Sequence, residues 1–507
     1  MNAENPGGPV RSTSNLTVMS PFDRRSFIKS AAVGAGLLAG GRAATAQAEE
    51  RVNLALPNLG QNHVNPRTPI DHVVVVMMEN RSVDHYLGWY KKENRRFDAT
   101  QERVYLDAAG NRRKTENWGA AGRADFAGCG FSDPGHGHGH GVVQARNTDA
   151  GGKPGEPDGF LKEGSGNDEF AVAYYQPDDI PVTAALTRQF TTFDRYFCSW
   201  LGPTYPNREY MHSAQSGGIT NNAFPPQRAQ TNPEWAAGFD WPTIWTALDA
   251  KGVTWKYYYS NLPVIALWGP RHARNARHVS EYYADCAAGT LPQVAFIDPF
   301  FVAPEGLAND DHPHADIRLG QMFLSDISRS FMESKHWHDG ALFITYDEWG
   351  GFWDHVPPPI VADPRSADPI GEFGKLGFRV PTQLISPFAA GGRVDKNVYD
   401  HTSILKFIET NWSLMPMKDW DAGTRDPGER NIVKAFGKFS YNGESRDRFL
   451  DTPAFEAPAA ANVPCEGHDT PVSDLFQLVD NGWMATYGFR TDFPFADAYR
   501  STLPVLR

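Results

Sequence analysis

Two pairs of oxygen-bearing side chains stand where the chain leaves two apolar runs, and both pairs suit a cation. Glu79 and Asn80 follow the run 72–78, and Asp347 and Glu348 follow the run 341–346. Carboxylate and amide oxygens are hard ligands of the kind that divalent metals prefer. Acidic residues after a strand are also common in solvated turns, so one pair alone would indicate little. Two pairs, each trailed by a histidine, favour a metal site built from these four residues.

A hydroxyl residue stands at the start of an expected helix. Thr204 follows the strand-like run 190–197 and precedes Pro206, a residue type that suits the first turn of a helix. A helix N-terminus with a guanidinium nearby is a favourable place for a phosphate group. Thr204 is therefore a candidate nucleophile, and Asn207 and Arg208 are candidates for substrate binding. Most threonines before a helix are plain caps, and position alone leaves that alternative open.

Histidines in three segments could hold a phosphoryl oxygen or carry a proton. His312 and His314 lie in the loop 309–316 before an expected helix, and His355 follows the second acidic pair. Imidazole titrates near neutral pH, which suits acid–base work. The run 134–140 alternates glycine with histidine and could also be an adventitious metal-binding tract. We expect one histidine of this run to point into the site and the others to face solvent.

The hydrophobic pattern supplies a scaffold that can bring these distant segments together. Runs of strand length cover 72–78, 293–297, 341–346 and 380–385, and amphipathic helices are expected around 319–327 and from 402. This alternation predicts an α/β fold with a mostly parallel sheet flanked by helices. Ligands bind such sheets at the carboxyl ends of the strands, where both acidic pairs stand. We expect the polar stretch from about 98 to 180 to form loop-rich insertions over that face.

The first 48 residues predict export. A twin-arginine core at 23–29 precedes a short apolar stretch and a small-residue cleavage signal, Ala46-Gln47-Ala48. We therefore expect residues 1–48 to be a signal peptide read by the twin-arginine export machinery, and the protein to be periplasmic or secreted. No later segment is long and apolar enough to be a membrane anchor. Residues 49–440 are expected to form one main domain, and residues 441–507 a C-terminal extension packed on it.

The net charge of the chain limits the classes of molecule that it can bind. The chain has 507 residues and a net charge of −12. That charge argues against nucleic-acid binding, which needs a cationic surface, and an anionic substrate must then meet a local positive site such as a metal ion. Four cysteines permit two disulfides in an oxidising compartment or buried free thiols, and their spacing does not decide between these: Cys129, Cys198, Cys286 and Cys465.

Four ordered motifs resemble those of the phosphoesterase family, which contains bacterial acid phosphatases, bacterial phospholipases C and plant non-specific phospholipases C. They are Glu79-Asn80-Arg81-Ser82-Val83-Asp84-His85, Pro203-Thr204-Tyr205-Pro206-Asn207-Arg208, Asn309-Asp310-Asp311-His312-Pro313 and Thr345-Tyr346-Asp347-Glu348-Trp349-Gly350-Gly351-Phe352-Trp353-Asp354-His355-Val356-Pro357. The resemblance covers roughly residues 70–415 and implies an alkaline-phosphatase-like core, so that 49–440 would be a phosphoesterase domain. Val83 and Trp353 depart from the family pattern, which bears on pocket shape rather than on chemistry.

The resemblance also implies roles for individual residues. It places the nucleophile at Thr204 and a phosphate site along His136, His312 and His355. It implies one divalent metal ion of unknown identity, bound by the two acidic pairs: Glu79, Asn80, Asp347 and Glu348.

From this reading we expect a phospholipase C. It would cleave a phosphatidylcholine-like phospholipid into diacylglycerol and a phosphorylated head group through a phosphothreonine intermediate. Transient contact with a membrane surface would follow from that substrate. A broad-specificity acid phosphatase is the alternative enzyme, and a catalytically silent exported binding protein is the alternative of another class.

Overall fold

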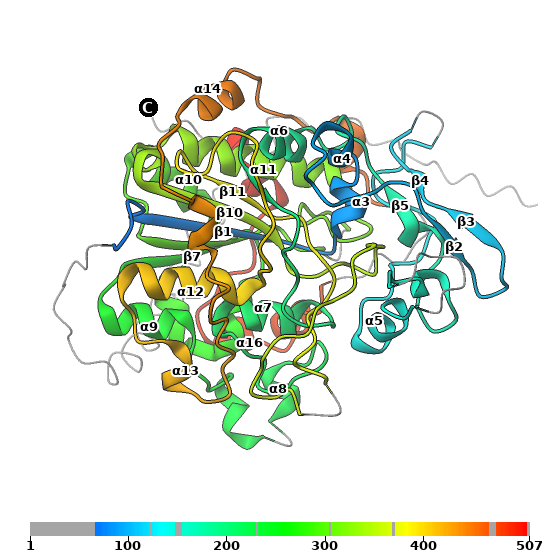
Figure 1. Cartoon of the computed structure of the whole chain (residues 1–507). Coiled ribbons are helices and arrows are strands. Elements are labelled where there is room, and N and C mark those ends of the chain that lie inside the picture. The colour runs from blue at the N-terminus through cyan, green and yellow to red at the C-terminus, as the bar shows by residue number, and fades with distance from the viewer. Residues whose placement is uncertain are drawn as a thin grey trace, which may run out of the picture. The chain divides into compact units, whose positions relative to one another are not determined.

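The computed structural model describes residues 66–120, 123–147, 155–229, 232–303, 306–367, 371–465 and 473–503 (Figure 1). The expected signal peptide, residues 1–48, lies outside the described residues and its assignment stays a prediction. Among the described helices, none is both long and apolar enough to cross a lipid bilayer.

An eight-stranded sheet forms the centre of the described structure, in the order β12-β6-β11-β10-β1-β9-β7-β8. Seven strands run in one direction, and β11 alone runs against both of its neighbours. The expected α/β fold with a mostly parallel sheet is therefore confirmed. The strands span β1 His72–Met78, β6 Thr191–Phe193, β7 Trp255–Tyr259, β8 Ala276–His278, β9 Val294–Asp298, β10 Gly340–Tyr346, β11 Gln383–Ile385 and β12 Val394–Asp395.

The two central strands show why the sequence contains unbroken apolar runs. All seven residues of β1 are buried, and so are all seven of β10. A strand covered on both faces tolerates no alternating polar residue, which produces the unbroken apolar runs. The run 380–385 behaves differently, because only residues 383–385 form β11 and that strand is antiparallel.

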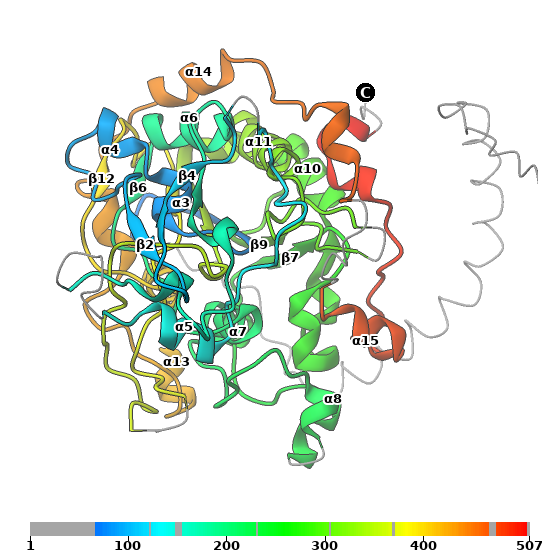
Figure 2. The same cartoon turned by 90° about the vertical axis from the view of Figure 1, so that its right-hand side faces the viewer.

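Helices cover both faces of the sheet (Figures 1 and 2). One layer contains α6 (Pro181–Gln189), α10 (Val279–Ala288), α11 (Ile317–Glu333) and α14 (Glu444–Leu450), with α11 in contact with α6 and α10. The other contains α7 (Thr204–Ser213), α9 (Ile244–Lys251) and α12 (His401–Trp412), with α7 in contact with both others. The apolar side chains between the sheet and these layers form one large core.

Shorter elements form the loops around this frame. In the insertion between β1 and β6 lie α3 (Val83–Leu87), α4 (Tyr90–Glu93), α5 (His138–Gln144), β2 (Val104–Leu106), β3 (Arg112–Lys114), β4 (Glu116–Asn117) and β5 (Ala173–Tyr174). Figure 2 shows α5 and β2 in front of the sheet when it is viewed from this side. The remaining short α-helices are α8 (Pro225–Arg228), α13 (Met417–Trp420), α15 (Phe476–Asp480) and α16 (Trp483–Thr486).

The segment after residue 440 is tied to the main unit at several points. The guanidinium of Arg329 on α11 donates to the carbonyl of Phe449, and the hydroxyl of Tyr283 donates to the carbonyl of Ala498. A disulfide joins Cys129 to Cys465 across 336 residues. The other two cysteines, Cys198 and Cys286, are buried free thiols. One disulfide and two thiols thus settle the question that the cysteine spacing left open.

Candidate active site

The pairing of β1 with β10 brings the two acidic pairs together. Met78 lies opposite Tyr346 in the parallel register, so the next residues, Glu79 and Asp347, leave the sheet side by side. The backbone N–H of Asn80 donates to Oδ1 of Asp347 at 3.2 Å. Segments separated by more than 260 residues therefore meet at the carboxyl edge of the sheet, where ligands of α/β proteins bind.

A tight backbone arrangement fixes the orientation of these residues. Asn80 adopts a left-handed conformation with φ of 59°, which asparagine tolerates better than most residues. Gly350, also at positive φ, packs against it, and a Cβ at that glycine would lie 2.4 Å from the Asn80 carbonyl oxygen. The loop after β10 thus needs glycine there. Oδ1 of Asp347 accepts the N–H of Glu348 at 2.7 Å as well as that of Asn80.

Arg208 lies beneath this edge and faces the carboxylates. Its guanidinium is fully buried and approaches Asp347 at 3.1 Å, Asp298 at 3.1 Å and Glu79 at 3.6 Å. Nη2 also donates to the carbonyls of Met77 and Met78 at the end of β1. Arg208 was expected to bind substrate, but here it points inward because the buried carboxylates outnumber the cations available to them.

Negative charge remains in excess around this arginine. Burial, followed by the repulsion of neighbouring carboxylates, raises the pKa of Glu79 well above its ordinary value, even though Arg208 opposes the rise. Burial likewise raises the pKa of Asp298 to about 6 and that of Glu348 to about 8. Asp310, whose carbonyl accepts the Glu79 N–H, has its pKa raised by burial to about 7. A single guanidinium does not balance this cluster.

The residues expected to bind a metal fit a divalent cation. Both side-chain polar atoms of Asn80 are buried without a hydrogen-bond partner, and so is Oε1 of Glu348. Buried polar atoms are rarely left unpaired, so each of these atoms calls for a further partner. A cation in contact with the oxygens would satisfy them and offset the excess charge. Asp347 is already bonded through both oxygens, to backbone N–H groups and to Arg208.

A cleft of about 140 Å³ opens above the acidic cluster. Thr204 lines it as the first residue of α7, and Pro206 lies in the first turn of that helix as expected. Glu79 reaches the cleft floor with 4% of its surface exposed. The lining residues come from five segments of the chain: Glu79; Asp133 and His136; Thr204, Tyr205 and Asn222; Val302 and His312; and Ser473 and Asp474.

Two histidines face each other across one side of this cleft. The rings of His136 and His312 lie 5.9 Å apart and nearly perpendicular. Nε2 of His136 is 4.0 Å from Oε1 of Glu348, and Nε2 of His312 is 3.9 Å from Asp133. Burial alone would lower the pKa of His136, but Glu348 and Asp133 outweigh it and raise that pKa to about 9. Burial lowers the pKa of His312 to about 4. Without a bound cation, the pair therefore contains one charged and one neutral imidazole at neutral pH.

Of the four expected metal ligands only Glu79 lines this cleft, because Asn80, Asp347 and Glu348 are fully buried behind it. Three further expected site residues also do not line it. Nδ1 of His355 lies 2.5 Å from Asp84, and its Nε2 lies 3.3 Å from Asp98. Nδ1 of His314 contacts the carbonyl of Ala127 at 3.2 Å. The side-chain amide of Asn207 bonds the backbone of the loop 200–203 just before α7. The structure therefore places Asn207 as a support for Thr204, and His355 in a separate ion-pair network.

The other histidines of the glycine–histidine run lie away from this cleft. Nδ1 of His138 contacts the carbonyl of Leu201 at 2.6 Å, and its ring stacks on Trp200. His140 is exposed. His136 is thus the member of this run that reaches the cleft.

The sequence interpretation missed several residues of the site. Asp298 ends β9 directly after the expected strand 293–297, so the strand-end rule that found Glu79 and Asp347 applied to it as well. Asp310 was named only within the motif that runs from Asn309 to Pro313, and no role was assigned to it. Asn222 and Asp474 carried no signal, because they reach the cleft from loops whose course depends on tertiary packing.

Three groups of side chains among the described residues bring possible metal-ligating atoms within 4.8 Å of one another: Asp133 with His136 and His312, Asp84 with Asp354 and His355, and His72 with His336 and Asp339. The first lines the cleft. In the second, the buried guanidinium of Arg379 already approaches Asp354 at 3.0 Å and Asp84 at 3.5 Å. The third lies at the opposite edge of the sheet, where β1 and β10 begin.

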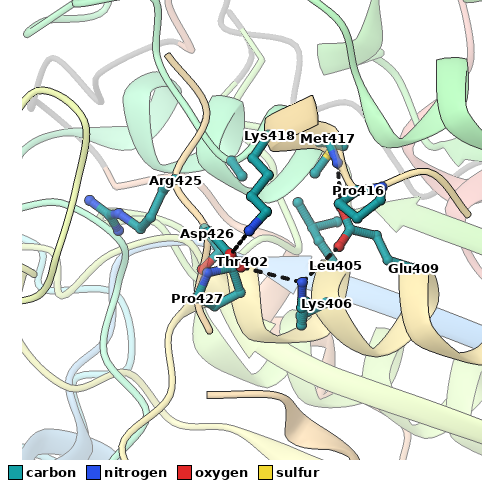
Figure 3. A pocket seen from close by; sticks show the side chains of 11 residues that line it. Thr402, Leu405, Lys406, Glu409, Pro416, Met417, Lys418, Arg425, Asp426 and Pro427 are labelled. Carbon is teal, nitrogen blue, oxygen red and sulfur yellow. Dashed lines mark hydrogen bonds and ion pairs between the residues drawn. The ribbon is translucent and has the colours of Figure 1, made fainter. Parts of the chain in front are cut away.

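A hollow beside α12 and α13 is not a comparable site (Figure 3). Its volume is about 10 Å³, which is roughly the space of one water molecule. The charged groups in it satisfy one another: Lys418 bonds Asp426 at 2.5 Å, and Lys406 lies 3.3 Å from the same carboxylate. None of the expected site residues lines it.

Comparison with known proteins agrees with the site. A model of the phosphoesterase family matches residues 70–415. Non-specific phospholipase C6 of Arabidopsis thaliana is 31% identical over 378 residues, which cover 69% of each chain. Phospholipase C B of Mycobacterium tuberculosis is 30% identical over 403 residues, covering 68% of this chain and 74% of the relative. Non-hemolytic phospholipase C of Pseudomonas aeruginosa is 27% identical over 502 residues, covering 87% of this chain and 67% of the relative.

The family match includes both acidic pairs, Thr204 and both cleft histidines. It extends over more than half of the chain, and the plant relatives exceed 30% identity over more than two thirds of it. The expected family is thereby confirmed. The chain belongs to the phosphoesterase family and is a hydrolase of phosphoric esters.

Proposed function

We propose that this protein is an exported phospholipase C that cleaves phospholipids such as phosphatidylcholine into diacylglycerol and a phosphorylated head group. The observation that carries the proposal is the convergence of Thr204, Glu79, His136 and His312 on one cleft above a buried acidic cluster. The plant, mycobacterial and pseudomonad relatives are all named phospholipases C, which favours a diester substrate.

Thr204 would supply the nucleophile. Its position at the start of α7 places the hydroxyl at the positive end of the helix dipole, which favours an anionic phosphate. Attack of Oγ on phosphorus forms the Oγ–P bond and breaks the bond from phosphorus to the glycerol oxygen. The hydroxyl proton passes to a base in the cleft, and the glycerol oxygen takes up a proton to leave as diacylglycerol.

Water completes the reaction. It attacks the phosphothreonine diester, breaks the Oγ–P bond and releases the phosphorylated head group, which restores the Thr204 hydroxyl. His136 and His312 are the imidazoles that line the cleft, so they are placed to receive and return the protons of both steps. His355, held between Asp84 and Asp98, is not.

A divalent metal ion held by Glu79, Asn80, Asp347 and Glu348 would neutralise the phosphate and stabilise the oxyanion of the nucleophile. The unpaired atoms of Asn80 and Glu348 and the raised pKa values of the carboxyls support that ligand set. The chain's own task is to hold these ligands in register, which the β1–β10 pairing and Gly350 accomplish.

We further propose that the protein leaves the cytoplasm by twin-arginine export and touches a membrane surface transiently during turnover. The ordered signal in residues 1–48 and the lipid substrate support this. Fractionation of cells that produce the wild type or a variant with Arg24→Lys and Arg25→Lys tests export. The wild type is expected outside the cytoplasm, and equal distribution of both proteins would exclude this route.

The catalytic proposal is tested with purified protein on phosphatidylcholine and on p-nitrophenyl phosphate, each with added divalent metal and in excess chelator. We expect metal-dependent release of diacylglycerol and phosphocholine from the lipid, identified by mass spectrometry. Cleavage of the monoester alone would establish the acid phosphatase alternative. Cleavage of neither substrate under any metal would leave only the binding-protein alternative.

A further inference from the structure

The cleft has a second wall that the proposed chemistry does not use. Tyr205, Asn222, Ser473 and Asp474 line it, and the last two belong to the segment after residue 440. This segment lies beyond residues 70–415, over which the family model matches. Two of the four wall residues, Ser473 and Asp474, therefore lie outside the matched family region.

The wall is built by a connected set of hydrogen bonds. Nδ2 of Asn222 donates to Asp474 at 3.3 Å, and Oδ1 of the same Asn222 accepts the backbone N–H of Tyr205 at 3.1 Å. The hydroxyl of Tyr205 accepts the N–H of Leu475 and lies 3.1 Å from the hydroxyl of Ser473. Asn222 thus bridges the first turn of α7 to Asp474, and the bridge holds the carboxylate at the cleft.

Asp474 differs from the other acidic residues of the cleft. Glu79 faces Arg208, and Asp133 faces His312. Among the ion pairs of the described residues, none includes Asp474. Within the part of the chain that the structure describes, its oxygens meet only the neutral amides of Asn222 and Gln477, each at 3.3 Å. A partly buried carboxylate without a cation leaves a negative potential at this wall.

We propose that Tyr205, Asn222 and Asp474 form a subsite for the cationic head group of the substrate, a quaternary or primary ammonium of the choline or ethanolamine type. The inference rests on the proposed phospholipase function and names its substrate class. Thr204 and Tyr205 are consecutive, so the phosphate and cation subsites adjoin, as the two-carbon link between phosphate and ammonium in such head groups requires. Asp474 supplies the counter-charge, and Asn222, which accepts the backbone N–H of Tyr205, holds that carboxylate in place.

The same residues predict what the subsite rejects. A glycerol or inositol head group has no charge for Asp474 and would leave the carboxylate without its counter-ion. A simple phosphomonoester does not reach the second wall at all. Discrimination therefore falls on the head group, while the chemistry at Thr204 is shared by every substrate.

The test compares the wild type with Asp474→Asn and with Asp480→Asn; Asp480 is an exposed acid at the end of helix α15, which begins two residues after Asp474, and it serves as the matched control. Each protein, loaded with divalent metal, is assayed on phosphatidylcholine and phosphatidylglycerol in identical mixed micelles and on p-nitrophenyl phosphate. We expect Asp474→Asn to lower kcat/KM for phosphatidylcholine by about five- to tenfold, mainly through KM, because a partly buried charge pair is lost. Rates on the other two substrates should stay within about twofold, and the control should match the wild type on all three.

A binding measurement keeps the outcome independent of turnover. Choline and its uncharged isostere 3,3-dimethylbutanol are titrated into wild type and Asp474→Asn by calorimetry. The subsite is supported if the wild type binds choline but not 3,3-dimethylbutanol, and if Asp474→Asn binds choline more weakly. Equal binding of both compounds, or equal loss of activity on both lipids, overturns it. Absence of lipid cleavage by the wild type would refute the proposed function, whereas the choline titration would still decide the subsite.

Discussion

Arg208 offers the most demanding check of the electrostatic argument. Its guanidinium is fully buried and approaches three carboxylates, of Glu79, Asp298 and Asp347, within 3.6 Å. Arg208→Met keeps the bulk of the side chain and removes the charge. Removing one partner of a buried ion pair typically costs about 3–5 kcal/mol. Three carboxylates lose their partner, but they can protonate instead of remaining charged. We therefore expect the free energy of unfolding to fall by about 4 kcal/mol at pH 8, rather than by the sum of three broken ion pairs.

The loss should depend on pH with a definite sign. Burial already raises the pKa values of Glu79, Asp298 and Asp347, and Arg208 opposes the rise at all three. Without the guanidinium these pKa values rise further. A carboxyl whose pKa is raised on folding favours the fold below its unfolded pKa and loses this contribution as pH rises through the folded pKa. The deficit of Arg208→Met should therefore be small near pH 4.5 and larger at pH 8.

Urea unfolding in excess chelator at pH 4.5 and pH 8 measures the loss in free energy of unfolding and its dependence on pH, without a contribution from bound metal. The matched control is Arg188→Met, because Arg188 pairs with Glu93 at 2.6 Å but is 44% exposed, and an exposed pair contributes less than about 1 kcal/mol. With about 2.1 cal/mol/K of unfolding entropy per residue over roughly 450 residues, 4 kcal/mol lowers Tm by about 4 °C. Equal destabilisation by both variants, or a deficit independent of pH, would refute the reasoning.

Four further outcomes are expected. Thr204→Ala should abolish turnover and cost at most about 1 kcal/mol of stability, as a helix cap does, whereas Thr204→Ser should stay active; near-normal rates in the alanine variant would exclude this nucleophile. Glu348→Ala should lose activity and bound metal by elemental analysis, and Asn80→Ala should lose less because its amide is uncharged; full metal content in the first variant would place the ion elsewhere. Cys129→Ser should lower the free energy of unfolding by up to about 6 kcal/mol, since the disulfide closes a loop of 336 residues, and a reductant that destabilised the variant as much as the wild type would contradict this. Asp84 and Asp98 raise the pKa of His355 from 6.5 to about 9 against the effect of burial, so His355→Gln should cost on the order of 2 kcal/mol at pH 6, and this cost should shrink as pH rises from 6.5 to about 9; a constant gap in chelator-treated protein would show that this pairing adds nothing.

The strands that are buried on both faces were predictable, because nearly all of their residues are apolar. The uninterrupted apolar runs of β1 and β10 located these strands within one residue, and the residues after them fell together because the register is parallel. The direction of β11 was not predictable, because three buried residues carry no information about which neighbour they pair with or in which sense. Short edge strands such as β12 were invisible for the same reason.

The candidate site divides along similar lines. Residues anchored to strand ends or to the start of a helix, such as Glu79, Asp347 and Thr204, are where the sequence pattern put them. Arg208 carries the ambiguity of every arginine near a phosphate site, since a guanidinium serves buried carboxylates as readily as a ligand. His355 belongs to the same motif as Asp347, yet the loop between them directs its side chain toward Asp84 and Asp98 instead of the cleft.

The reversed strand β11 has a practical consequence for handling this protein. Because it runs against the other strands, its carboxyl end lies at the edge of the sheet away from the cleft, and the hydroxyl of Ser386 reaches the carbonyl of Gly340 at the start of β10. A few residues on, the loop that follows β11 reaches Arg393, which is exposed. A cysteine or affinity handle at that loop would anchor the molecule to a chip or resin by its rear edge, so every immobilised copy would present the cleft to a suspension of lipid vesicles.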